Sequence, residues 1–152
     1  MRKLMITMLI VLMFSILLAV EADLIVGKWY TENNSSIVEI IPRGDTFYGK
    51  IIELKEPNYS ADHEYANQEK MDLENPEEAL RSRKLVGLEI LSGLSFSAKK
   101  ASWIKGRIYD PESGKTYYCK IIYENDDELT IRGSLDKWGL AGRSSIWRRV
   151  GK

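Results

Sequence analysis

Short runs of β-branched and aromatic residues follow one another through most of this chain, and their close spacing constrains its fold more than any other feature. Three such runs occupy residues 26–31, 36–41 and 46–54, with turn-forming residues between them. The pattern resumes at residue 88 with about five further runs, two of them joined by a hairpin loop at residues 110–115 that contains Pro and Gly. These intervals leave no room for crossover helices, so we predict an all-β fold, a single antiparallel up-and-down barrel of about eight strands.

Strict alternation within the runs predicts which side chains share a face of the sheet. Lys120 should point to water, so its neighbour Cys119 is predicted to lie inside the barrel as a small buried hydrophobe. Between residues 103 and 109 the same rule places Trp103 on the face opposite to Gly106.

The N-terminus has the three parts of a secretory signal. Two basic residues precede an apolar run over residues 4–20, and small residues follow up to Ala22. We therefore predict a signal peptide at residues 1–22 and an exported domain, periplasmic or secreted, at residues 23–152. A retained membrane anchor is the alternative, because the apolar run just reaches the length that crosses ~30 Å of hydrocarbon.

Composition argues against several classes of function. The 22 basic residues balance the 22 acidic ones, so no net positive charge attracts nucleic acid. The one histidine, His63, lies in a polar stretch, Cys119 has no partner for a disulfide, and no Gly-rich phosphate loop is present. We therefore predict no metal site, no cofactor and no catalytic residues, and catalysis is the less favoured interpretation.

Residues 55–85 break the strand pattern and form a long polar insert, which is uncommon within a compact domain unless it has a function. Asn75 followed by Pro76 is typical of a helix N-cap with proline in the first turn. Acidic residues follow directly and basic residues come near the end, as the helix dipole favours. We therefore predict a short helix of one or two turns that stops at Gly87.

Five segments carry a resemblance to a known family. They read IVGKWYT, YGKIIELKEPN, NPEEALRSRKLVGLEIL, GRIYDPESGKTY and, near the end, LTIRGSL with GRSSIWRRV. In this order they resemble the exported bacterial family called domain of unknown function 2147, over residues 25–150. The resemblance implies a lipocalin-like β-barrel and carries no settled activity. Residues 59–71 depart from the family pattern, in which this connection is shorter.

The first predicted strand contains Gly27-Lys28-Trp29, which resembles the Gly-x-Trp signature of lipocalin-type barrels. Trp29 can plug one end of a barrel, and an arginine from the last strand can stack over its indole as a cation–π lid. Trp147 lies on that last strand and is predicted to take part in closing the barrel. The candidate arginines are Arg143, Arg148 and Arg149.

Two arginines of the insert, Arg81 and Arg83, would be separated by about 200° around a helix and cannot share one face. One interpretation is that either arginine pins the insert to the barrel by pairing with a carboxylate or with main-chain carbonyls. The other is that it holds the carboxylate or phosphate of a ligand through a bidentate contact. The candidate residues for lid pinning or ligand binding are Arg81, Arg83, Asp72, Asn75, Tyr109, Asp110 and Tyr117.

Three functions compete on these grounds. The favoured one is an exported envelope protein that holds a small amphiphilic or apolar ligand in its barrel, with the insert as a lid. The second is an interaction or scaffold protein of the envelope whose barrel is filled with side chains. The third is a hydrolase acting on an envelope polymer through Asp72, Asp110 or Glu112. The expected partners are thus a small lipophilic ligand or an envelope protein, and a membrane only through an uncleaved N-terminal segment.

Overall fold

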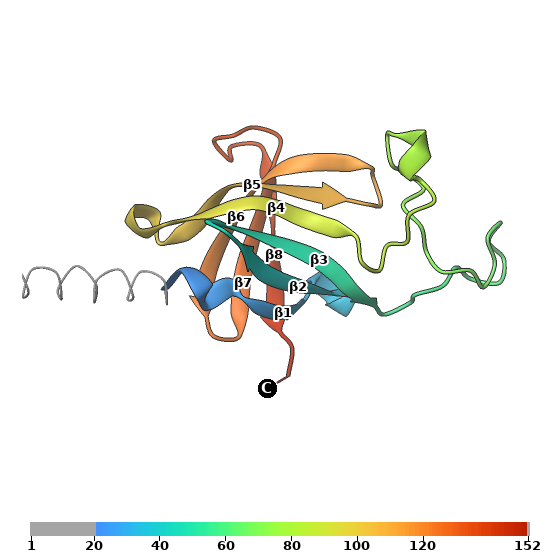
Figure 1. Ribbon diagram of the computed structural model, residues 1–152, viewed down its shortest axis with the longest axis horizontal. Coiled ribbons are helices and arrows are strands. Elements are labelled where there is room, and N and C mark those ends of the chain that lie inside the picture. Colours follow the sequence, from blue (N-terminus) through green and yellow to red (C-terminus); the bar gives the residue numbers. More distant parts are fainter. Residues whose placement is uncertain (1–20, 152) are drawn as a thin grey trace, which may run out of the picture.

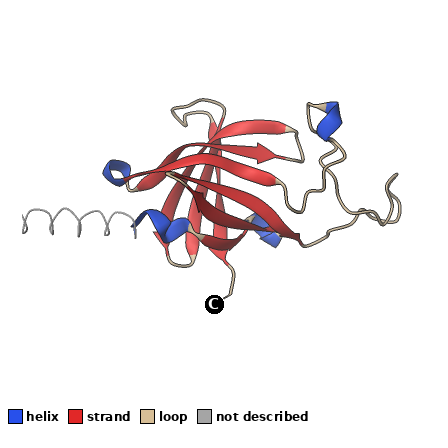
Figure 2. Ribbon diagram, in the orientation of Figure 1, coloured by secondary structure: helices blue, strands red, loops and turns tan. Residues whose placement is uncertain are grey.

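The computed structural model describes residues 21–151 and contains a closed barrel of eight antiparallel strands (Figures 1 and 2). Each strand pairs with the next one in the chain, and β8 pairs back with β1. The predicted all-β, up-and-down barrel is therefore confirmed. The strands are β1 (Gly27–Tyr30), β2 (Ser36–Arg43), β3 (Thr46–Leu54), β4 (Glu89–Ser97), β5 (Ser102–Asp110), β6 (Lys115–Asn125), β7 (Glu128–Ser134) and β8 (Gly142–Arg149).

Four 3₁₀ turns accompany the strands, and one of them replaces the helix predicted between Asn75 and Gly87. Glu77 has an extended backbone, with φ −90° and ψ 110°. Its N–H donates to Oδ1 of Asn75 (2.9 Å), so Asn75 forms a local turn instead of capping an α-helix. The predicted helical turn is present, but it is a single 3₁₀ turn over Glu78–Leu80 and does not extend to Gly87. The 3₁₀ turns are η1 (Asp23–Ile25), η2 (Glu32–Asn34), η3 (Glu78–Leu80) and η4 (Ala98–Lys100).

Strict alternation fails in β5, where Trp103 and Gly106 both face the interior. Lys105 lies between them with φ 65°, and the strand register shifts at this point, which marks a β-bulge. The residues opposite them on β6 are Ile121 and Cys119, which share the buried face. The prediction that Trp103 and Gly106 lie on opposite faces is wrong, because the bulge inverts the alternation. The predicted burial of Cys119 is confirmed, and burial raises the pKa of its thiol to about 12.

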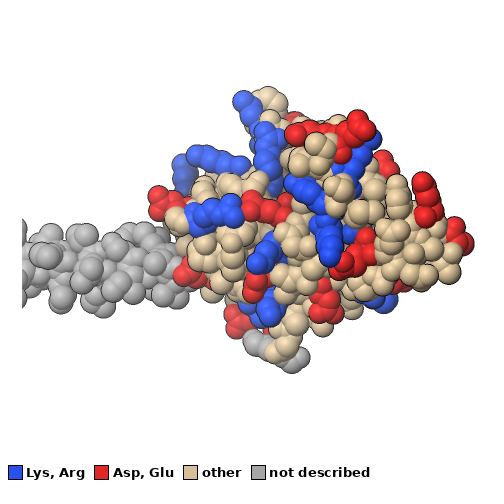
Figure 3. All heavy atoms as spheres, turned by 45° about the vertical axis from the view of Figure 1, so that its right-hand side comes forward, with Lys and Arg blue, Asp and Glu red and all other residues tan. Residues whose placement is uncertain are grey.

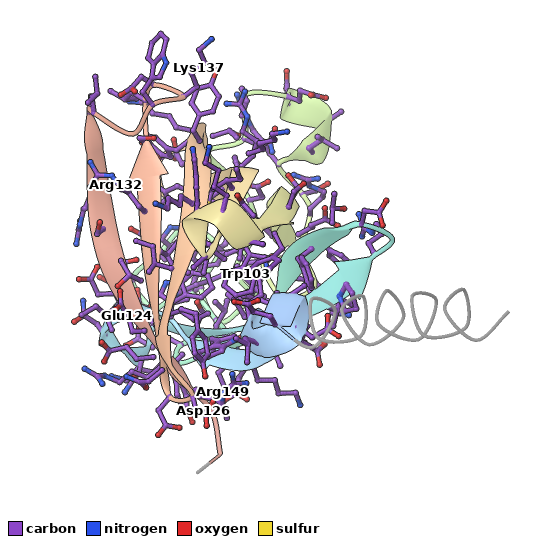
Figure 4. All side chains as sticks on the ribbon, turned by 90° about the vertical axis from the view of Figure 1, so that its left-hand side faces the viewer. Trp103, Glu124, Asp126, Arg132, Lys137 and Arg149 are labelled. Atoms are coloured by element: carbon purple, nitrogen blue, oxygen red, sulfur yellow. The ribbon has the colours of Figure 1, made fainter. Side chains whose placement is uncertain are left out.

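One end of the barrel is closed by η1 and by large side chains that pack beneath it (Figure 4). Nε1 of Trp29 donates to the carbonyl of Ile25 (2.9 Å), and Nε1 of Trp103 donates to the carbonyl of Ala22 (2.9 Å). Both indoles are thus buried with their polar atoms satisfied. We call the buried set at this end the plug; its members are Ile25, Trp29, Val38, Ile40, Phe47, Leu91, Leu94, Trp103, Cys119, Ile121, Leu129 and Trp147.

The seam between β1 and β8 is short, and Arg149 reinforces it. These strands share only two residue pairs, one of them Trp29 opposite Arg149. The guanidinium carbon of Arg149 lies 4.0 Å from the centroid of the Trp29 ring. Its nitrogens donate to the carbonyls of Leu24 (2.9 Å), Val26 (3.0 Å) and Asp126, which lies beside Arg149 in Figure 4. One side chain of the last strand therefore holds η1 against the end of the barrel.

The predicted signal peptide, residues 1–22, lies outside the described residues except for Glu21 and Ala22. Within residues 21–151, no helix has the length and apolar character needed to cross a membrane.

Replacement of Arg149 by lysine tests the importance of this contact for stability. Lysine keeps the positive charge but loses the planar group that stacks on Trp29 and reaches several carbonyls at once. We expect Arg149→Lys to lower the free energy of unfolding in urea by about 2 kcal/mol. The matched control is Arg148→Lys, because Arg148 makes an exposed ion pair with Glu128 worth less than about 1 kcal/mol. Equal losses in the two variants would contradict the proposed role of Arg149.

Candidate ligand-binding site

The end of the barrel opposite η1 opens into a cavity of about 1040 Å³. The β1–β2 turn, the insert of residues 55–85, the β5–β6 hairpin and the β7–β8 loop surround its mouth. Figure 1 shows the insert extending beyond the barrel at this end. Pockets that bind small molecules commonly measure roughly 300–1,000 Å³, so this cavity has room for a ligand.

The deeper wall of the cavity is mainly apolar. It is lined by Ile51, Ile90, Ile108 and Ile131, which point inward from four different strands. Gly133 leaves additional room, because a Cβ built on it would meet only the side chains of Ile108 (3.6 Å) and Tyr117 (3.8 Å). The barrel is therefore solid in its closed half and hollow in its open half.

The rim of the cavity carries charges of both signs. Arg143 pairs with Glu32 (2.9 Å), and Lys70 lies 3.8 Å from Glu56. Figure 3 shows acidic and basic side chains interspersed over this side of the molecule. The charged residues at the rim are Glu32, Lys55, Glu56, Lys70, Asp110, Glu112, Lys115 and Arg143.

Asp72 connects the insert to the barrel. Its side chain has no exposed surface, although it is a carboxylate. Oδ1 accepts a hydrogen bond from the hydroxyl of Tyr109 on β5 (2.6 Å), and Oδ2 accepts from Asn75 Nδ2 (2.8 Å) and from the guanidinium of Arg83 (2.8 Å). A buried carboxylate is tolerated only when it is paired and hydrogen-bonded, and these three donors meet that condition.

Tyr109 is the residue of the barrel wall in this network. Its hydroxyl donates to Asp72 and accepts from Asn75 Nδ2 (3.3 Å). Burial, and then the hydrogen bond to Asp72, raise the pKa of Tyr109 to about 12. The phenol therefore stays protonated and remains a donor to Asp72 at neutral pH.

The two arginines of the insert make different contacts within the same short segment. Arg83 pairs with the Asp72 carboxylate, while Nε of Arg81 donates to the main-chain carbonyl of Asn75 (2.8 Å). The backbone N–H of Asp72 also donates to the carbonyl of Arg83 (2.9 Å). Both side chains thus stabilise the insert itself, and neither lines the cavity.

The other candidate residues lie in different parts of the barrel. Asp110 lies at the rim and organises its hairpin, since its carboxylate accepts from the N–H of Glu112 (3.0 Å) and from Ser113 Oγ (2.6 Å). Tyr117 lines the cavity, and Trp147 belongs to the plug. Arg143 lies at the open mouth, where it pairs with Glu32, so its predicted role in closing the barrel over Trp29 is wrong.

The residues of the cavity wall carry no functional signal in the sequence. The isoleucines at positions 51, 90, 108 and 131 look like core residues in the sequence, and a glycine at position 133 carries no chemical signal. Strand alternation could have indicated that Ile131 and Gly133 face inward together. It could not indicate that the space in front of them is open.

Among residues 21–151, no group of three or more His, Cys, Asp and Glu side chains is arranged to hold a metal ion.

A closed eight-stranded up-and-down barrel, plugged at one end and open to a cavity at the other, defines this protein as lipocalin-like. Such an architecture is suited to ligand binding.

The chain belongs to a bacterial family described as "Uncharacterized protein conserved in bacteria (DUF2147)", whose model matches residues 27–149. It is also similar to a solved structure described as "Protein HP1028 from the human pathogen Helicobacter pylori belongs to the lipocalin family". The two are 28% identical and superimpose with a TM-score of 0.69, over 83% of this chain and 82% of the other. No curated protein matches the chain.

Replacement of Arg83 by glutamine tests the network around Asp72. The substitution removes the cation from a carboxylate that has no access to water. We expect Arg83→Gln to lower the free energy of unfolding by about 1–3 kcal/mol. It should also increase amide hydrogen exchange within residues 70–85, because Asp72, which attaches the insert to Tyr109 of the barrel, loses the cation that pairs with it.

The neighbouring residue provides the control. Lys84 pairs with Glu69 through side chains that are both more than half exposed, so Lys84→Gln should cost less than about 1 kcal/mol. Similar stability and exchange in the two variants would show that the Asp72 network does not hold the insert.

Proposed function

We propose that this protein binds one small amphiphilic or apolar ligand in the open half of its barrel. The observation that carries this proposal is the cavity of about 1040 Å³, with an apolar wall and a polar rim. The apolar part of the ligand would lie against Ile51, Ile90, Ile108 and Ile131, where each Å² removed from water contributes about 25 cal/mol. Its polar end would lie at the rim among side chains of both charges.

The insert contributes a fixed wall in this proposal. Leu85 and Lys70 line the cavity, and both flank the segment that Asp72 attaches to Tyr109. A wall that is already in place costs less conformational entropy on ligand binding than one that must become ordered. The role of Arg83 is therefore to hold the insert in position instead of contacting the ligand.

The two other interpretations have less support. A scaffold with a filled barrel does not account for the cavity, since the plug occupies only the closed half. A hydrolase that uses Asp72 would need this carboxylate to reach a substrate, but its side chain has no exposed surface.

We also propose that the protein acts outside the cytoplasm, in the periplasm or as a secreted protein. The support is the basic and apolar sequence of residues 1–22. Cell fractionation combined with the intact mass of the exported protein would test this. A protein found only in the cytoplasm with its first residues in place would contradict it.

Filling the cavity tests ligand binding directly. A side chain at position 133 enters the cavity between Ile108 and Tyr117 at ordinary contact distances. With cis-parinaric acid, a fluorescent fatty acid, as the probe, we expect Gly133→Leu to weaken binding by about tenfold or more while the protein stays folded. Gly133→Ala adds only one methyl group and should have a smaller effect.

The control for this experiment is Thr130→Leu, which places a leucine on the outer face of the same strand, β7. Unchanged affinity in Gly133→Leu, or an equal loss in Thr130→Leu, would contradict binding in the cavity. Native mass spectrometry of the protein purified from its own cells would then show whether it carries a molecule of defined mass.

A further inference from the structure

The β7–β8 loop, residues 135–141, exposes three large apolar side chains beside the mouth of the cavity. Leu135 is 72% exposed, Trp138 74% and Leu140 83%. The other tryptophans are at most 3% exposed, so Trp138 differs from them in its surroundings. Apolar residues grouped in this way on a protein surface mark a site of interaction.

The loop that carries these exposed side chains is held by hydrogen bonds. The Asp136 carboxylate accepts hydrogen bonds from the backbone N–H groups of Trp138 (2.9 Å), Leu140 (3.2 Å) and Ala141 (2.7 Å). Arg132 donates to the carbonyl of Gly139. These hydrogen bonds hold the backbone of the loop, while its large apolar side chains remain exposed. These side chains are presented to solvent by a fixed backbone.

Cationic side chains accompany the apolar ones. Figure 4 places Lys137 at the tip of this loop and Arg132 along β7. No ion pair involves either of them within the part of the chain that the structure describes. The Asp136 carboxylate is turned toward backbone N–H groups of the loop, which lower its pKa and keep it ionised. Arg143, at the end of the loop, is offset by Glu32.

We propose that residues 135–141 dock the protein onto the surface of an anionic phospholipid bilayer. Tryptophan and leucine bury themselves at the boundary between headgroups and acyl chains, and Lys and Arg beside them attract anionic headgroups. Leu135 and Ala141 also line the mouth of the cavity, so docking brings the mouth to the lipid surface. The docking does not depend on the proposed function, because it needs no ligand in the cavity.

A second copy of the chain fits this loop less well. A tryptophan buries at most about 250 Å² and the two leucines are smaller, whereas a stable interface buries about 800 Å² on each partner. Lys137, whose ammonium lies 4.9 Å from the centroid of the Trp138 ring, is also of a residue type that is depleted in the centre of protein interfaces and favoured at a lipid surface.

Tryptophan fluorescence provides a test that is local to the loop. The full-length protein is mixed with vesicles of phosphatidylcholine, with and without phosphatidylglycerol, whose acyl chains are brominated or not. Trp138 is 74% exposed and the other three tryptophans at most 3%, so lipid at the loop acts mainly on Trp138. Trp103 contacts Ala22, so lipid bound by the N-terminal segment would act on a signal that a change in the loop leaves unaltered. We expect a shift to shorter wavelength and quenching by the brominated chains, both stronger with phosphatidylglycerol.

The variant Leu135→Ser/Leu140→Ser keeps Trp138 as the reporter and removes the apolar side chains on both sides of it. We expect it to lose most of the quenching, whereas Ile146→Thr, which alters an exposed apolar residue on the outer face of β8, should keep it. The proposal is overturned if the native protein is not quenched, if quenching is the same without phosphatidylglycerol, or if the double variant is quenched as strongly. It is also overturned if the double variant abolishes a dimer in sedimentation while the native protein shows no quenching.

Discussion

The contact between Arg149 and Trp29 is the interaction on which the rest of the structure depends. The barrel closes through only two residue pairs between β1 and β8, which is little hydrogen bonding for a seam. Arg149 compensates by stacking on Trp29 and by donating to the carbonyls of Leu24 and Val26, which precede β1 in the chain. It thereby joins the two ends of the sheet and fixes η1 over the plug.

The closed end allows the other end to be hollow. Packing in the plug is tight: a Cβ on Gly106 would lie 2.4 Å from a methyl carbon of Leu94. At Gly133, on the open side, the nearest atom would be 3.6 Å away. Since most of the buried hydrophobic residues belong to the plug, the open half can keep a cavity without the protein losing its core. The Asp72 network then holds the insert as part of the cavity wall.

Strand periodicity was sufficient to predict the barrel and the burial of Cys119, because side chains alternate between two faces along each strand. It was insufficient for Trp103, since a single bulge residue inverts the faces and leaves no clear mark in the sequence. The helical capping pattern was outweighed by contacts between residues far apart in the chain, such as Asp72 with Arg83 and the barrel. Which arginine stacks on the first strand depends on the register of the seam, and this register is known only from the closed barrel.

The central claim is that ligand is bound in the open half of the barrel and not in the plug. Isoleucine residues occur in both halves, so NMR of isoleucine methyl groups during titration with a fatty acid tests the claim most directly. We expect saturable shifts for Ile51, Ile90, Ile108 and Ile131, which line the cavity, and little change for the plug isoleucines 25, 40 and 121. Shifts confined to the plug, or no saturable shift at the cavity isoleucines, would contradict the account.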